Sequence, residues 1–273
     1  MGSTRMPSVV DIAVALTTAR RRAVPLADFP GPLPNDLTTA YAAQEAAIAL
    51  WPDEIAGWKV AMIAPNLMDR LAAPRLAGPV FRGNLRDEAE NRGDLEVAVI
   101  PGGFAAVETE IAIVIGRDIP LRDRPWTEAE LVARIGSMRL AMEIAGSPLA
   151  TINQLGPPAV VSDFGNNTAI ALGDAIAGWH DLPAQRLATA MRIDGVEVGR
   201  GSPAAVPGGP LQALQFLVEH LASRGRWLVR GDVVSTGATT GIHLVRPGQT
   251  AEARITNCPP LAVRITAAAP KAA

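Results

Sequence analysis

The apolar residues of this chain are spaced as in helices at its start and as in strands over most of its remaining length. From Ser8 to Arg22 they recur every three or four positions, and Ser8 with Asp11 forms a capping box, which predicts an amphipathic helix. Prolines interrupt the pattern before Asp36 opens a second helix, rich in alanine. The two helices predict a small N-terminal helical segment over residues 1–53.

Short apolar or alternating runs separated by Gly and Pro follow, and they predict many short β-strands. The predicted strands are residues 55–62, 80–85, 95–100, 106–115, 140–144, 160–163, 168–172, 190–199, 233–236, 242–245, 251–255 and 261–265. Within 190–199 the pair Asp194-Gly195 indicates a hairpin, because both residues tolerate positive φ.

Two further helices are predicted among these strands. Thr127 and Glu130 form a second capping box, and another helix runs from Pro210 to a glycine cap at Gly225. Strands outnumber helices and do not alternate regularly with them, which argues against a doubly wound fold or a (β/α)₈ barrel. We therefore expect an α+β fold, with one large domain over residues 54–273.

Composition and charge exclude several classes of protein. The net charge of -2 and the low aromatic content give no electrostatic or stacking surface for nucleic acid. No apolar run is long enough to cross a membrane, so no membrane partner is expected. The single cysteine, Cys258, excludes an intrachain disulfide and fits a reducing compartment, which makes the cytoplasm the expected location.

The candidate chemistry begins in the predicted strand that contains Glu108 and Glu110. Side chains two positions apart in a strand share a face, with Cβ atoms roughly 7 Å apart. Two carboxylates leading into a buried strand repel each other unless something positive lies between them, and a divalent cation is the usual solution. The alternative is an edge strand on which both glutamates are merely solvated.

A third acid, Glu143, interrupts the apolar run 140–144. Three carboxylates without a nearby cysteine or histidine favour Mg²⁺, Mn²⁺ or Ca²⁺ over zinc. Pairing with some of the chain's many arginines is the alternative explanation.

Lys59 is a charge within another apolar strand, where it either takes part in proton transfer or extends to solvent. Asp163 ends the predicted strand 160–163 and is a candidate acceptor for Lys59, or else an ordinary turn residue before Gly165. Near the C-terminus, Thr236 and Gly237 lie in a loop of small residues whose backbone N–H groups suit a carboxylate. Neither a phosphate-binding Walker loop nor a Gly-x-Ser-x-Gly motif is present.

Taken together, several short motifs resemble the fumarylacetoacetate hydrolase superfamily, and within it the 2-keto-4-pentenoate hydratase and 4-oxalocrotonate decarboxylase branch. These motifs are Gly57-Trp58-Lys59, Glu108-Thr109-Glu110, Glu143, Ser162-Asp163 with Asn166, Asp194-Gly195 leading to Gly199-Arg200-Gly201, and Ser235-Thr236-Gly237. Their order and spacing extend the resemblance from about Gly57 to Val263.

The resemblance implies a mixed β-roll with flanking helices, assembled as a homo-oligomer. It implies one Mg²⁺ or Mn²⁺ ion held by Glu108, Glu110 and Glu143, and a 2-oxo acid that chelates this ion. Lys59 matches the active-site lysine of the family, and Asp163 matches a supporting position. The loop at Thr236 and Gly237 matches the contact to the substrate carboxylate.

One departure from the family pattern concerns proton transfer. Where the hydratase pattern reads Pro-Asp-Phe, this chain reads Pro79-Val80-Phe81, and valine cannot carry a proton. Arg82, the next residue, is a candidate contact for an anionic substrate, or else an ordinary exposed arginine.

The expected function is a metal-dependent lyase, a hydratase or decarboxylase, acting on a small 2-oxo or 2-hydroxy-dienoic acid from aromatic-compound breakdown. One alternative is a C–C hydrolase of acylpyruvate type, although the chain lacks a histidine before His180 to activate water. The other is a catalytically silent homologue that binds 2-oxo acids without turning them over.

Overall fold

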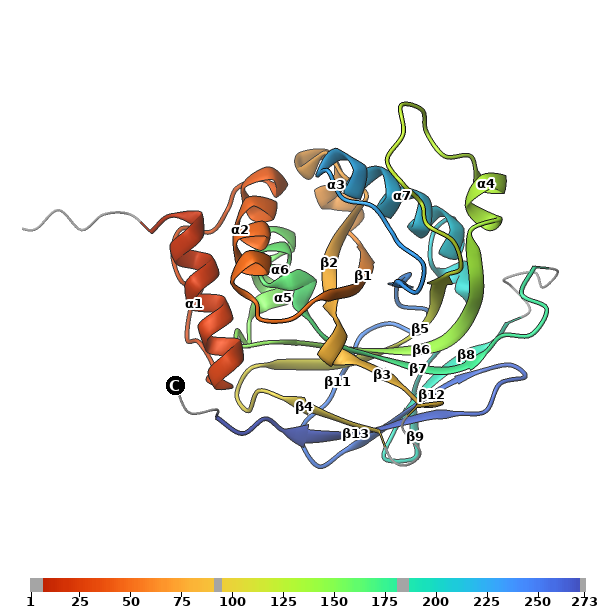
Figure 1. Ribbon diagram of the computed structural model, residues 1–273. Helices are drawn as coiled ribbons and strands as arrows, with labels where there is room; N and C mark the ends of the chain where they lie inside the picture. Colours follow the sequence, from red (N-terminus) through yellow and green to blue (C-terminus); the bar gives the residue numbers. More distant parts are fainter. Residues whose placement is uncertain (1–6, 91–94, 181–186, 271–273) are drawn as a thin grey trace, which may run out of the picture.

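A computed structural model describes residues 7–90, 95–180 and 187–270 of the chain. Two β-sheets form its centre, and Figure 1 shows α1 and α2 at the left of the strands and α7 above them, toward the right. This is the α+β fold with curled sheets that the sequence predicts.

The helices of the described residues fall into an N-terminal group, one short helix before β6, a short pair before β7 and one long helix near the C-terminus. They are α1 (Val9–Arg22), α2 (Leu37–Leu50), α3 (Pro65–Leu71), α4 (Glu128–Val132), α5 (Ile152–Leu155), α6 (Pro157–Ser162) and α7 (Gly209–Ser223), with 3₁₀ turns η1 (Arg82–Asn84), η2 (Phe164–Asn166) and η4 (Pro203–Ala205). The Ser8 hydroxyl accepts from the Asp11 N–H and the Ser8 N–H donates to the Asp11 carboxylate, so the predicted capping box is confirmed.

The larger sheet has the strand order β2-β1-β10-β5-β6-β7-β3, and β11 pairs with β5 outside this path. Its strands are β1 (Ile55–Met62), β2 (Arg75–Phe81), β3 (Leu85–Asp87), β5 (Phe104–Ile115), β6 (Ile135–Ser147), β7 (Asn167–Ala175), β10 (Val233–Ser235) and β11 (His243–Leu244). β2 also contacts β7, although four strands separate the two in this order, so the sheet curls strongly on itself.

The smaller sheet has the order β4-β13-β12-β8-β9. Its strands are β4 (Leu95–Val99), β8 (Thr189–Ile193), β9 (Val196–Gly201), β12 (Thr250–Ile255) and β13 (Leu261–Ala267). β8 and β9 form the hairpin predicted at Asp194-Gly195, and both turn residues have positive φ, 50° and 80°.

The main apolar core lies between the two sheets and extends under α7. Alternate residues of β5 and β6 point into it, among them Ile111, Leu140 and Met142, and Leu217 of α7 packs against the same core. Because side chains alternate along a strand, the residues between them point to the other face of the sheet, where the charged residues lie.

A second core joins the N-terminal helices to the sheet. Leu16 of α1 and Leu37 of α2 pack with Phe104 of β5 and Ala145 of β6. The N-terminal helical segment therefore shares its apolar core with the long strands, and the division between residues 53 and 54 stays a prediction.

Two predicted strands were wrong. Residues 160–163 belong to the end of α6, which begins with two prolines at its first turn, a position that suits proline. Such a short apolar run cannot be told from a buried helix by its pattern alone. The predicted strand 80–85 is divided, because η1 turns the chain between β2 and β3.

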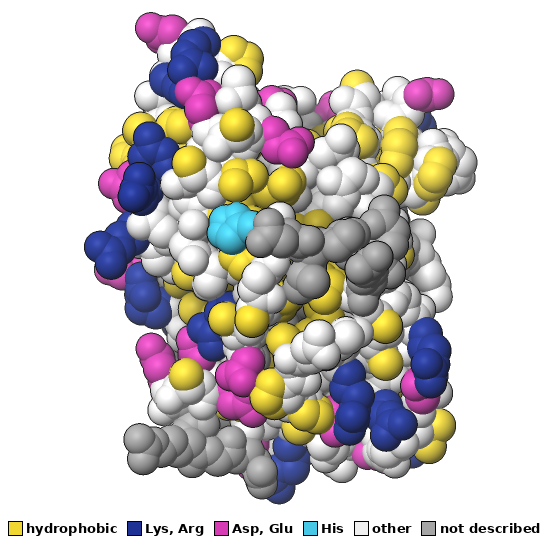
Figure 2. Space-filling model, turned by 90° about the vertical axis from the view of Figure 1, so that its right-hand side faces the viewer, with side chains coloured by type: hydrophobic (Ala, Val, Ile, Leu, Met, Phe, Trp, Pro, Cys, Tyr) yellow, Lys and Arg dark blue, Asp and Glu magenta, His cyan; other side chains and the backbone are white. Residues whose placement is uncertain are grey.

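The surface in Figure 2 carries basic and acidic side chains next to one another at its margins, and apolar side chains gather nearer its middle. This face has no continuous basic area of the kind that binds nucleic acid. Among the described helices, none combines the length and the apolar character that crossing a membrane requires.

Candidate metal centre

The pairing of β5 with β6 brings three glutamates together. Glu108 and Glu110 lie two positions apart on β5, so they share one face of the sheet. Glu143 of β6 lies directly opposite Glu108 in the antiparallel register. One carboxylate oxygen from each residue lies within 4.8 Å of the other two.

These three side chains are buried, with exposed fractions of 7% for Glu108, 1% for Glu110 and 0% for Glu143. In the part of the chain that the structure describes, Oε2 of Glu143 has no hydrogen-bond partner. A buried carboxylate oxygen without a partner is costly, and a cation between the three groups removes that cost. Because every donor atom is a carboxylate oxygen, the cluster fits a hard divalent metal ion.

Without a metal ion, burial and mutual repulsion make the charged forms of these carboxyl groups unfavourable. The pKa of Glu108 is raised to about 8, because burial and the charge of Glu143 raise it by more than the charge of Lys59 lowers it. Burial and the charges of Glu143 and Glu108 also raise the pKa of Glu110 well above its usual value. Metal binding therefore has to displace protons from these carboxyl groups.

Lys59 is the cation that the structure places beside the cluster. It lies on β1, and its Nζ is 3.3 Å from Oε1 of Glu143 and donates a hydrogen bond of 3.1 Å to the carbonyl of Gly165. Burial alone lowers the pKa of Lys59, but the charges of the three glutamates outweigh burial and raise it. Lys59 therefore carries a proton next to the carboxylates.

A glycine allows this arrangement of Lys59. Gly78 of β2 lies opposite Lys59, and a Cβ atom there would lie 2.1 Å from the carbonyl oxygen of Phe164. Any larger residue would push η2 away from the sheet, and with it the Gly165 carbonyl that accepts from Lys59.

Two groups that the sequence analysis did not assign hold the glutamates in place. Asn167 donates from Nδ2 to Oε1 of Glu143 at 3.0 Å, and the Ser235 hydroxyl donates to Oε2 of Glu110. Ser235 belongs to a motif that carried the family resemblance, and Asn167 directly follows Asn166 of another, but the partners of both residues depend on strand pairing. Such outer contacts orient metal-binding carboxylates.

The predicted substrate loop supports the cluster directly. The N–H of Gly237 donates to Oε2 of Glu110 at 2.9 Å, and the Thr236 hydroxyl donates to the carbonyl of Ile111 at 2.8 Å. The Gly237 N–H and the Thr236 hydroxyl therefore both donate to acceptors on β5, and the loop lies next to the carboxylate of Glu110. A contact between this loop and a substrate carboxylate stays a prediction.

Asp163 lies away from the partner expected for it. Its carboxylate accepts from the Arg20 guanidinium and, at 2.6 Å, from the Ser147 hydroxyl, whereas Lys59 bonds to Gly165. Arg20 comes from α1 and also donates to the carbonyls of Gly146 and Asn167. The expected support of Lys59 by Asp163 is corrected accordingly, and the buried ion pair instead fastens α1 to the sheet.

Arg82 and Val80 have contrasting surroundings. Arg82 lies in η1 with its side chain 66% exposed, and its guanidinium is 3.6 Å from the Glu54 carboxylate. Val80 of β2 is fully buried in a small apolar cluster. The structure does not bring Arg82 into contact with the three glutamates of the candidate metal centre.

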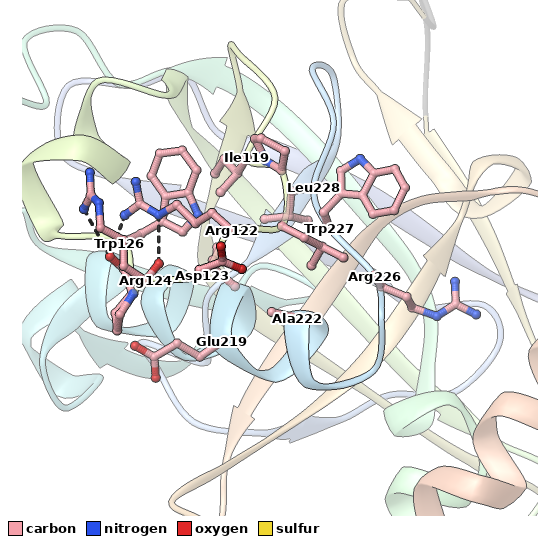
Figure 3. A pocket seen from close by; sticks show the side chains of 14 residues that line it. Ile119, Arg122, Asp123, Arg124, Trp126, Glu219, Ala222, Arg226, Trp227 and Leu228 are labelled. Atoms are coloured by element: carbon pink, nitrogen blue, oxygen red, sulfur yellow. Dashed lines mark hydrogen bonds between the residues drawn. The ribbon is translucent and has the colours of Figure 1, made fainter.

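A surface cavity of about 250 Å³ lies elsewhere, between the 119–126 loop and the C-terminal half of α7. Figure 3 shows Trp126 and Trp227 among its lining side chains, with Arg122 next to Trp126. None of the three glutamates lines it, so this cavity is separate from the candidate metal centre.

The fold and the cluster together define a protein whose strongly curled sheet brings three buried carboxylates close enough to share one divalent cation. Residues 87–266 match the family model described as fumarylacetoacetate (FAA) hydrolase C-terminal. This match covers more than half of the chain, and the chain belongs to this family. The family resemblance in the sequence is thereby confirmed.

Named relatives agree with this assignment. The chain is 28% identical to 2-keto-4-pentenoate hydratase of Burkholderia vietnamiensis, covering 91% of this chain and 94% of the relative. It is 29% identical to a protein of Pseudomonas putida named TodF product hydratase, over 81% of each chain. These relatives bear out the expectation that the chain is an enzyme related to hydratases and decarboxylases.

Among solved structures, the fold is similar to that of 4-oxalocrotonate decarboxylase from Pseudomonas putida G7, complexed with magnesium and adipate. The TM-score is 0.76 at 21% identity, and the match covers 94% of this chain and 97% of the other. At this identity the likeness confirms the predicted fold.

Proposed function

We propose that this protein is a metal-dependent lyase, a hydratase or decarboxylase, that acts on a small 2-oxo or 2-hydroxy-dienoic acid from the breakdown of aromatic compounds. The observation that carries the proposal is the buried cluster of Glu108, Glu110 and Glu143 with Lys59 beside it. Its donor set suits Mg²⁺ or Mn²⁺, and a bound ion supplies Lewis-acid polarisation of a chelating 2-oxo acid.

Other residues of the chain orient the glutamates and supply a proton. Asn167 and Lys59 fix the orientation of Glu143, and Ser235 and Gly237 fix that of Glu110. Lys59, protonated and buried, is the group placed to give a proton at Nζ to a bound substrate. Burial of all four charged side chains excludes water and strengthens their interactions.

A test of this function measures turnover of a panel of 2-hydroxy-dienoic and 2-oxo acids with Mg²⁺ or Mn²⁺ and with chelator. We expect turnover that requires the metal and that the Glu110→Gln variant loses. The matched control is Glu219→Gln on the exposed face of α7, which leaves turnover unchanged. Metal-independent turnover, or full activity of Glu110→Gln, would contradict the proposal.

A catalytically silent homologue is the second candidate, and the apolar side chain of Val80 favours it. Titration calorimetry with oxalate, a mimic of the chelating end of a 2-oxo acid, separates the two. Oxalate binding that requires Mg²⁺, together with no turnover of any acid in the panel, would establish the silent form.

We also propose that the protein forms a homo-oligomer. The support is a set of exposed apolar side chains on β9 and in the 242–244 segment: Val196 (66% exposed), Val198 (40%), Ile242 (55%) and Leu244 (71%). Among the described strands β9 is the last of its sheet, so its outer edge is available to a second copy of the chain. Sedimentation should show a multimer that Leu244→Glu weakens and Leu50→Glu, at an exposed site of α2, does not; a monomeric wild type would contradict this.

A cytoplasmic location stays a prediction, supported by the single cysteine.

A further inference from the structure

Gln44 of α2 is a fully buried polar residue that lies outside the metal centre. Its Nε2 donates to the carbonyl of Ala77 at 3.0 Å and to the carbonyl of Val161 at 2.9 Å. Its Oε1 accepts from Nη2 of Arg224 at 3.0 Å. Because both N–H groups and the oxygen of the side-chain amide are engaged, the orientation of this amide is fixed.

The two carbonyls that Gln44 binds belong to different elements of the fold. Ala77 lies on β2, the first strand in the order of the larger sheet, where outer carbonyls have no neighbouring strand to pair with. Val161 lies in the last turn of α6, where carbonyls lack a partner further along the helix. α2 and α6 lie side by side in Figure 1. One planar amide group of Gln44 therefore ties the edge of β2 to the end of α6.

The side chain of Lys59 passes between the same two parts of the chain. Lys59 lies opposite Gly78, the residue after Ala77, and its Nζ donates to the carbonyl of Gly165 in η2, which follows α6. The passage is narrow, because a Cβ atom on Gly165 would lie 3.0 Å from Cα of Gly78 and 3.1 Å from Cδ of Lys59. The separation of β2 from α6 and η2 therefore determines where Nζ of Lys59 lies.

We propose that Gln44 is a positioning residue for Lys59: its amide sets the separation of β2 from α6, and so holds Nζ of Lys59 beside Glu143. Nζ lies 3.3 Å from Oε1 of Glu143 in this arrangement. The consequence for turnover rests on the proposed function, because there Lys59 gives a proton to the substrate. The placement of Lys59 itself is tested without a substrate.

Tyr41 provides a matched control for Gln44. It lies three positions earlier on α2, and its hydroxyl accepts from the N–H of Ala77 at 2.9 Å. Among the described residues, this hydroxyl bonds to β2 and not to α6. Tyr41→Phe therefore removes a hydrogen bond to the same residue of β2 while the tie to α6 stays, whereas Gln44→Met removes the tie.

Chemical labelling of amines measures the placement of Lys59 directly. Lys59 and Lys271 are the only lysines of the sequence, so an amine-reactive ester followed by peptide mass spectrometry compares Nζ of Lys59 with an internal reference. In the presence of Mg²⁺, Gln44→Met should label Lys59 at least about fivefold faster relative to Lys271 than the wild type does, because the gap opens more often. Tyr41→Phe should stay within about twofold of the wild type.

Equal labelling of the wild type and Gln44→Met would overturn the inference, and so would the same acceleration in Gln44→Met and Tyr41→Phe. Gln44→Asn keeps an amide in the buried site but is one methylene shorter, so it cannot reach both carbonyls at once. It should accelerate labelling in the same direction, and it takes the place of Gln44→Met if that variant does not fold.

Turnover separates this role from a general loss of structure. With an acid that the wild type turns over, Gln44→Met should lower kcat by about tenfold or more and change KM by less than about twofold. Mg²⁺-dependent oxalate binding should be retained, because Asn167 and Ser235 still hold the glutamates. An unchanged kcat, or weakened oxalate binding, would overturn the role of Gln44 in turnover. A wild type that turns over no acid would contradict the proposed function, and the labelling would still decide whether Gln44 positions Lys59.

Discussion

Replacing Glu108 with glutamine should stabilise the metal-free protein at neutral pH. The pKa of Glu108 is raised to about 8, so below that pH the folded protein binds a proton that the unfolded chain releases near pH 4.5. The stability present at acidic pH is therefore lost as the pH rises from about 4.5 to 8. Glutamine has the shape of the protonated side chain and does not titrate, so the variant avoids this loss.

The size of the effect follows from linkage. About 2.5 pH units separate the ordinary pKa of a glutamate from pH 7, and each unit corresponds to about 1.4 kcal/mol, which gives a gain of about 3–4 kcal/mol for the variant. For a chain of this length that corresponds to a rise in Tm of roughly 6 °C or more. At pH 4 the two proteins should have nearly equal stability.

Thermal and urea unfolding with a chelator, measured from pH 4 to pH 8, test this reasoning. Glu219→Gln, an exposed site on α7, is the control and should change the unfolding free energy by less than about 0.5 kcal/mol at every pH. Added Mg²⁺ should stabilise the wild type and have little effect on Glu108→Gln. A glutamine variant that is no more stable at pH 7, or a difference that does not vary with pH, would refute the account of the charge cluster.

Three further predictions concern other parts of the site. Lys59→Met should lower turnover by about 10²-fold or more while oxalate still binds with Mg²⁺; turnover near the wild-type rate would exclude Lys59 as the proton donor. Ser235→Ala should weaken Mn²⁺ binding by about 10-fold to 100-fold in calorimetry. Ser162→Ala, which removes a buried hydroxyl bonded to Pro158, is its control and should not weaken binding. Arg20→Leu leaves the Asp163 carboxylate buried without its cation and should lower the unfolding free energy in urea by about 3–5 kcal/mol, and a loss below about 1 kcal/mol would contradict this.

Local periodicity predicted the part of the site that lies within single strands. The two-residue spacing of Glu108 and Glu110 placed them on one face, and the charges at Glu143 and Lys59 were conspicuous because their neighbours are apolar. The capping box at Ser8 and the hairpin at Asp194-Gly195 are also local signals, and the structure confirms both.

The remaining features depend on contacts between distant segments. Arg20 and Asp163 are 143 positions apart, and no spacing rule relates them, so the partner of Asp163 was assigned wrongly. Residues 160–163, at the end of α6, were taken for a strand because a short apolar run fits either structure. The role of Ser235 depends on the register of β10 against β5, which the sequence of neither strand specifies.

The central claim is that Glu108, Glu110 and Glu143 together hold one divalent ion. Crystals grown with Mn²⁺ and examined by anomalous diffraction test it most directly. We predict one strong manganese peak within about 2.0–2.4 Å of a carboxylate oxygen from each of the three glutamates. A map without a peak at this position, or with its only strong peak at another site, would contradict the claim.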